Sequence, residues 1–192
     1  MTRSDPVLAA LAGLAALASA PVAAQPAGLV ASGACRDGQP NGAYELRSAN
    51  GQVRISGAYA KGHRTGTFLF WSATGARIAL VPYDDDRRTG TVTLWFATGD
   101  GRGEAQRRAE AAYVGDVLHG MTRSWYPNGN PRTELRYEDG NLAEARAWIE
   151  SGAPLPEYEA RAMAERDRVS DGGFVAGLEQ FAAEHRPRCA HP

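Results

Sequence analysis

The residues that could support catalysis or bind a metal are the histidines, the cysteines and one run of aspartates. The 4 histidines are His63, His119, His185 and His191. No two of them have the spacing of metal ligands, and the chain contains no Gly-x-Ser-x-Gly motif. The carboxylates of residues 84–86 could bind a cation, but Asp is also a common turn residue, and Arg87 and Arg88 follow at once to balance the charge. We therefore expect no enzyme activity, no cofactor and no metal site.

The 2 cysteines, Cys35 and Cys189, lie near opposite ends of the chain. An isolated pair of cysteines in an oxidising compartment usually forms a bridge. We predict an intramolecular disulfide between them. The alternatives are two unrelated thiols or an intermolecular link.

A row of tryptophans is the feature most typical of a binding surface. Trp71, Trp95 and Trp125 recur at a fixed place in a repeated pattern, and Arg123 and Arg132 stand close to the last of them in sequence. Trp and Arg are over-represented among the residues that dominate the binding energy of protein interfaces. The row therefore predicts a surface that binds another protein. The alternative is a second small core, formed by Trp71 with the apolar residues Leu69, Ile78 and Leu80.

The tryptophans belong to a repeat that extends over residues 42–152. Its three clearest copies are GTFLFWSATG, GTVTLWFATG and GMTRSWYPNG. Each copy opens with Gly, carries Trp five residues on and a turn Gly nine residues on. Two weaker copies begin at residues 42 and 143, so successive copies are 24, 24, 30 and 23 residues apart. Periods of this length indicate an array of small supersecondary units.

Each copy predicts one antiparallel β-hairpin, because aromatic and β-branched residues flank a turn dipeptide that ends in Gly. Asn50-Gly51 and Asn128-Gly129 are typical of type I′ turns. A two-residue turn places each opening Gly opposite a Tyr, as Gly66 opposite Tyr83, and the ring can cover backbone that Gly leaves bare. It also places Arg132 opposite Trp125, close enough for a cation–π contact. One face of the sheet is then apolar and buried, and the other carries the tryptophan row.

The composition becomes helical after Pro156. Residues 157–170 and 174–186 predict two helices separated by Asp171-Gly172-Gly173, and the second helix has an amphipathic stripe of Phe174, Leu178 and Phe181. We expect both helices to pack on the sheet. About 30 helical residues at 1.5 Å each match the roughly 45 Å across ten strands. The tail can therefore return along the apolar face and bring the Cα of Cys189 within ~7 Å of that of Cys35.

The repeat resembles the MORN-repeat variant family, whose members are often labelled as antitoxins of the YwqK family. The resemblance rests on the pattern G-x4-W-[YF]-x-[NT]-G followed by Tyr and an acidic-Gly pair, as in Tyr137-Glu138-Asp139-Gly140, and covers residues 41–152. It implies a β-meander of stacked hairpins that serves as an interaction scaffold, with no shared catalytic residues. The chain departs from the pattern at Arg47, at Asp86 and in the insertion near residues 100–107.

The first 24 residues differ from the rest of the chain. A short basic start, an apolar run from Val7 to Ala20, and small residues at Val22 and Ala24 are typical of a secretory signal peptide cleaved after Ala24. The apolar run is short for the ~20 residues that span a bilayer. We therefore expect a periplasmic or secreted protein without stable membrane insertion after cleavage. An exported chain could neutralise a partner only outside the cytoplasm.

These features predict a mainly β protein with three parts: a signal peptide (1–24), a meander of about five stacked hairpin repeats (25–156) and a C-terminal helical lid of two helices packed on the sheet (157–192). The 21 basic and 22 acidic residues nearly cancel, which argues against a nucleic-acid partner. We expect a non-enzymatic scaffold that binds an unknown protein partner and neutralises it as an antitoxin-like or immunity-like protein. The alternative is a cell-envelope structural protein that binds peptidoglycan or another glycan, because aromatic rows also stack on sugars.

Overall fold

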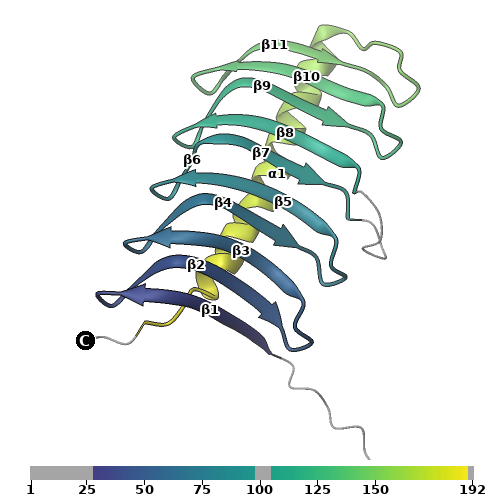
Figure 1. The fold of residues 1–192 in the computed structure, drawn as a ribbon. Coiled ribbons are helices and arrows are strands. Elements are labelled where there is room, and N and C mark those ends of the chain that lie inside the picture. The colour runs from purple at the N-terminus through teal and green to yellow at the C-terminus, as the bar shows by residue number, and fades with distance from the viewer. Residues whose placement is uncertain (1–27, 98–104, 190–192) are drawn as a thin grey trace, which may run out of the picture.

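The computed structural model describes residues 28–97 and 105–189. The predicted signal peptide lies outside these residues. The described chain forms one antiparallel sheet followed by one helix (Figure 1). No helix among the described residues is both long enough and apolar enough to cross a membrane.

The sheet is a meander, in which almost every strand pairs with the strands before and after it in sequence. The strand order is β1-β2-β3-β4-β5-β7-β8-β9-β10-β11, and the short strand β6 pairs with β5. The strands are β1 (Leu29–Arg36), β2 (Gln39–Ser48), β3 (Val53–Ala60), β4 (His63–Trp71), β5 (Arg77–Asp84), β6 (Arg87–Arg88), β7 (Gly90–Trp95), β8 (Arg107–Val114), β9 (Val117–Trp125), β10 (Pro131–Glu138) and β11 (Asn141–Ala147). The mainly β meander predicted from the repeats is confirmed.

The predicted pairing of opening glycines with tyrosines is confirmed in four hairpins. The pairs are Gly42 with Tyr59, Gly66 with Tyr83, Gly90 with Tyr113, and Gly120 with Tyr137. All four opening glycines have positive φ, from 66° to 115°. Because L side chains rarely adopt this conformation, backbone geometry explains why Gly recurs at the start of each hairpin.

The prediction of type I′ turns at Asn50-Gly51 and Asn128-Gly129 is wrong. In the hairpin of β2 and β3, the amide of Gly51 donates to the carbonyl of Ser48, and the amide of Ser48 donates to the carbonyl of Gln52. Of Asn50 and Gly51, only Gly51 has positive φ, at 84°. This is a three-residue loop with a type I turn followed by a left-handed Gly. The extra residue shifts the register by one position beside each turn, so Trp71 pairs with Arg77.

The two ends of the array also differ from the prediction. The fifth hairpin has one strand, β11, and its return segment makes a single bridge between Trp148 and Pro154, because prolines at 154 and 156 cannot donate ladder hydrogen bonds. At the other end, β1 adds a strand that the repeat did not predict, since LVASGACR has neither the Trp nor the alternation of the other copies.

The tail is one helix, α1 (Glu157–Glu184), and not two. Gly172 and Gly173 do not interrupt it. A Gly in a helix costs roughly 1 kcal/mol relative to Ala, and packing offsets this cost, since Phe174 and Val175 join the core directly after the glycines. Asp171 is held by an ion pair with Arg108 of β8. Contacts with the sheet on both sides of the glycines therefore favour a continuous helix.

The helix returns along the sheet from β11 to β1 (Figure 1). One core cluster joins the aromatic residues of β2 to β5 with Val175 and Ala182 of α1. A second cluster joins Leu135 and Tyr137 of β10 with Ala160 and Ala164. The hydroxyl of Tyr83 donates to Glu179 of the helix at 2.8 Å. Burial and the neighbouring Glu179 raise the pKa of Tyr83 above its ordinary value, so its hydroxyl remains a donor.

The predicted disulfide between Cys35 and Cys189 is confirmed, with Cα atoms 5.8 Å apart. It joins the end of β1 to the segment that follows α1. Close by, the Tyr44 hydroxyl donates to the carbonyl of His185, and Arg186 donates to the carbonyl of Gly62. The C-terminal end of the chain is thus fixed to the N-terminal end of the sheet.

Candidate binding face

The three repeat tryptophans lie on the sheet face opposite the helix. Trp71, Trp95 and Trp125 are the last residues of β4, β7 and β9. Their neighbours in the strand, such as Phe70 and Leu94, point into the core beneath the helix, and alternate residues of a strand face opposite ways. The repeat therefore places one Trp at the same end of every second strand.

Arginines separate the tryptophans of this row. The guanidinium carbon of Arg77 lies 4.3 Å from the ring centre of Trp95, and that of Arg107 lies 5.9 Å from the ring centre of Trp125. Arg107 also pairs with Trp95 across β7 and β8. Arg77, Trp95, Arg107 and Trp125 thus form an alternating ladder, which we call the Arg–Trp ladder. Such contacts are worth ~0.5–1 kcal/mol each at exposed sites.

The Arg–Trp ladder lines an open groove together with Leu80, Thr93, Gln106 and Glu110. Arg107 forms an ion pair with Glu110 at 2.7 Å. Trp95 is 8% exposed, because its neighbours and Arg77 cover it, whereas Trp71 and Trp125 are half-buried. The groove therefore offers one accessible ring, that of Trp125, beside a mixture of charged and amide groups.

The predicted arginines occupy different places. Arg123 lies on this face and is exposed, at a register position between Glu110 and Glu134. Arg132 does not pair with Trp125, because the bulge beside the turn pairs Trp125 with Pro131. Arg132 instead lies 5.8 Å from the ring centre of Tyr126 and forms an ion pair with Asp167 of the helix. The expected contact between Arg132 and Trp125 is thus corrected: Arg107 takes this place.

Sequence reasoning missed Arg77 and Arg107. A signal was present, since both stand eleven residues after an opening Gly once the insertion in the third copy is allowed for. The two arginines were not predicted because the expected two-residue turn placed a different residue opposite each Trp.

Asp85 and Asp86 lie in the tight turn after β5, and the expected linker residues His63 and His119 instead belong to β4 and β9, next to such turns. One carboxylate oxygen of Asp86 accepts hydrogen bonds from the Arg64 amide and side chain at 2.8 and 2.9 Å, and the other lies 2.7 Å from His63. Asp86 has positive φ. Its carboxylate thus joins two hairpins, as expected for a turn residue. Within the described ranges, no group of three or more His, Cys, Asp or Glu side chains could hold a metal ion.

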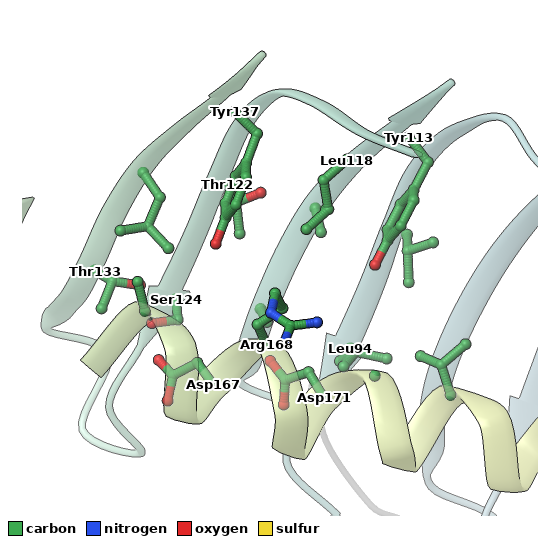
Figure 2. A pocket seen from close by; sticks show the side chains of 17 residues that line it. Leu94, Tyr113, Leu118, Thr122, Ser124, Thr133, Tyr137, Asp167, Arg168 and Asp171 are labelled. Carbon is green, nitrogen blue, oxygen red and sulfur yellow. Dashed lines mark hydrogen bonds between the residues drawn. The ribbon is translucent and has the colours of Figure 1, made fainter. Parts of the chain in front are cut away.

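A second cavity lies between the sheet and the helix (Figure 2). Small side chains of β8 and β9, including Ala109 and Thr122, face Gly172 of α1 across it. The hydroxyls of Tyr113 and Tyr137 also line this space (Figure 2). Its volume of about 50 Å³ is far below the ~300 Å³ of a small-molecule site and fits a few water molecules. This cavity therefore gives no site for a cofactor.

Asp171 borders this cavity and faces Arg108. Burial raises the pKa of Asp171 above its ordinary value, and the charge and hydrogen bond of Arg108 offset that effect only in part. The Arg132 and Asp167 pair lies one helical turn away. The two pairs fix the helix to β8 and β10, so their arrangement serves docking of the helix.

Comparison with protein-family models finds no match, and a search of the curated proteins finds none either.

Proposed function

We propose that this chain is an exported, non-enzymatic repeat scaffold that binds another protein through the Arg–Trp ladder. The observation that carries the proposal is the groove on the open face of the sheet, where Trp125 lies beside Arg107 and where Arg77 and Glu110 also form part of the lining. Interfaces are enriched in Trp and Arg, and a few such residues supply most of the binding energy. The helix covers the other face, which leaves this one for a partner.

Two observations support export as part of the proposal. Residues 1–24 have the pattern of a signal peptide, and disulfides such as Cys35–Cys189 persist mainly in oxidising compartments. We infer a periplasmic or secreted protein. Its resemblance to MORN-repeat variants favours an antitoxin-like or immunity-like role against a partner outside the cytoplasm.

Glycan binding is the second candidate. Gln106 and Glu110 beside Trp125 could donate to and accept from sugar hydroxyls. Against it, Arg77 lies over the ring of Trp95, and a sugar would need such a ring face for stacking. The protein-binding proposal is therefore the better supported of the two.

The test is affinity capture with the exported, oxidised protein from its own periplasm or medium, after N-terminal sequencing has identified Gln25 as the first residue. Three baits are compared: wild type, the double variant Arg77→Ala, Trp125→Ala, and the control Tyr158→Ala, which removes an aromatic residue that is 71% exposed on the helix. Thermal unfolding verifies that all three are folded.

We expect wild type and the Tyr158→Ala control to capture the same protein, and the double variant to bind the purified partner at least about tenfold more weakly, since loss of one interface anchor costs ~2 kcal/mol. Equal binding by all three baits would overturn the assignment of this face. Retention on insoluble peptidoglycan that depends on Trp125, without a protein partner, would establish the glycan alternative.

A further inference from the structure

The two edge strands of the sheet are protected to very different extents. At one edge, residues 153–155 fold back on the end of β11, where the amide of Leu155 donates to the carbonyl of Ala147. Arg161 of the helix donates to the carbonyls of Leu142 and Ala143. The strand also carries Glu144 and Arg146. Charges and covered carbonyls are the usual means by which proteins prevent an edge strand from pairing further.

The opposite edge, strand β1, lacks these protections. Residues 29–35, LVASGAC, contain no charged residue and no proline. All residues of the strand except Leu29 are exposed, and Val30 is 62% exposed. Among the described residues, the backbone of β1 is hydrogen-bonded to β2 alone. An eight-residue strand of this kind is a template for another strand.

The strand is also held rigid in the paired conformation. Cys35 is bridged to Cys189, and Pro187 packs on Gly33 so closely that a Cβ at residue 33 would lie 2.7 Å from the proline ring. A partner strand therefore meets an ordered edge and incurs little of the usual cost of ordering it.

We propose that β1 pairs antiparallel with β1 of a second copy of this chain, so that a two-fold axis joins the two sheets into one. Two residues that are paired across neighbouring strands have their side chains on the same face of the sheet. For two copies of the same strand, the numbers of the paired residues must therefore add up to an even number. With Ser32 opposite Ser32 of the other copy, residues 29–35 all pair, and Arg36 lies opposite Gly28, so no like charges meet. A shift to Gly33 opposite Gly33 would bring the Pro187 rings of both copies together over the axis.

The asymmetry of the edges favours this occupant over others. Pairing of β1 with β11 of another copy would extend without limit, but the covered edge of β11 prevents it. Pairing of β1 with itself uses both free edges and closes the assembly. The Arg–Trp ladder starts at β5 and remains free in such a dimer.

The test is sedimentation velocity of the oxidised mature protein across a concentration series that reaches the high micromolar range. The variant Val30→Lys, Ser32→Lys places four positive charges in the proposed interface at two positions that face solvent in the monomer. The control Val114→Lys, Val169→Lys adds the same charge at exposed positions of β8 and α1 that are not paired with each other. Circular dichroism and a thiol assay verify that the fold and the disulfide are intact.

We expect a dimer for wild type and control. The dissociation constant of the dimer should be at least about tenfold higher for the β1 variant, because like charges directly opposite each other destabilise a strand pair. A monomer at every concentration would overturn the proposal. So would a dimer that the β1 lysines leave unchanged, since the interface would then lie elsewhere.

Discussion

Gly57 shows how closely the aromatic core fits the sheet. This residue is in β3 and is paired with Tyr44 of β2. A Cβ at residue 57 would lie 2.7 Å from three ring atoms of Phe68, which is completely buried. The rings of Tyr59 and Tyr83 contact Phe68 edge-on, so it has no free space to move into. Small-to-large changes at such sites force side chains out of their preferred rotamers.

We predict that Gly57→Ala lowers the free energy of unfolding by ~1–3 kcal/mol, measured by urea denaturation. The matched control is Gly28→Ala, because no atom lies within 4 Å of a Cβ at residue 28. The control should unfold like the wild type. A Gly57→Ala variant as stable as the wild type would mean that Phe68 is less constrained than its contacts indicate.

At the scale of elements, equivalent aspartates join successive hairpins. Asp86 binds Arg64, and Asp116 binds the amide and side chain of Arg88 in the same way at 3.0 and 2.7 Å. Burial alone would raise the pKa of both carboxyls, but the hydrogen bonds and charges of the arginines outweigh it and hold each pKa below its ordinary value. The ionised form therefore stabilises the folded state.

The sign of the pH dependence follows from these lowered pKa values. The stabilisation is present above the unfolded pKa of ~3.9 and is lost as the pH falls through the folded value. We predict that Asp86→Asn, Asp116→Asn is ~1 kcal/mol less stable than wild type at pH 7, a small value because both side chains are partly screened by solvent. The difference should persist to about pH 5 and shrink below pH 4.

Denaturant titrations of both proteins from pH 7 to about pH 3 measure this difference. The control is Asp84→Asn, since Asp84 is exposed and its carboxylate makes no ion pair or hydrogen bond with residues 28–97 or 105–189. A difference between wild type and the double variant that stays constant down to pH 3 would show that the carboxylate charges contribute nothing.

Most of the fold could be predicted from the sequence because the residues that define each hairpin lie close together in the chain. The Gly and Tyr pairs and the strand periodicity predicted four hairpins with the right partners. The turn type was wrong because Asn-Gly suits both a two-residue and a three-residue loop, and Trp71 and Arg132 moved by one position as a result. The sequence predicted that the three tryptophans share one face of the sheet, but the positions of Arg77 and Arg107 beside them depend on the bulge.

The helix and β1 were harder to predict because tertiary contacts decide them. Gly172 and Gly173 lie in a continuous helix whose stability comes from packing on the sheet. Strand β1 has weak strand propensity and forms because β2 offers it an edge and the disulfide fixes its end. The continuity of the helix through Gly172 and Gly173 and the pairing of β1 with β2 leave no local pattern in the sequence.

At the scale of the whole molecule, the disulfide changes the way the array loses its structure. Repeat arrays are quasi-one-dimensional, so each hairpin is stabilised mainly by its neighbours and unfolding begins at the ends. Cys35 and Cys189 are separated by 154 residues, and their disulfide attaches β1 to the segment that follows α1. The chain-entropy model gives ~4 kcal/mol for a loop of this length.

We predict that Cys35→Ala, Cys189→Ala lowers the free energy of unfolding by up to ~4 kcal/mol and loosens the molecule unevenly. Hydrogen exchange should rise most in β1 and at the C-terminal end of α1, where the contacts of Tyr44 with His185 and of Arg186 with Gly62 depend on the bridge. Exchange in β10 should change least, because its contacts with the start of α1 lie at the far end of the helix. An equal rise along the whole sheet would mean that the array unfolds as one cooperative unit, in which case the bridge stabilises every hairpin alike.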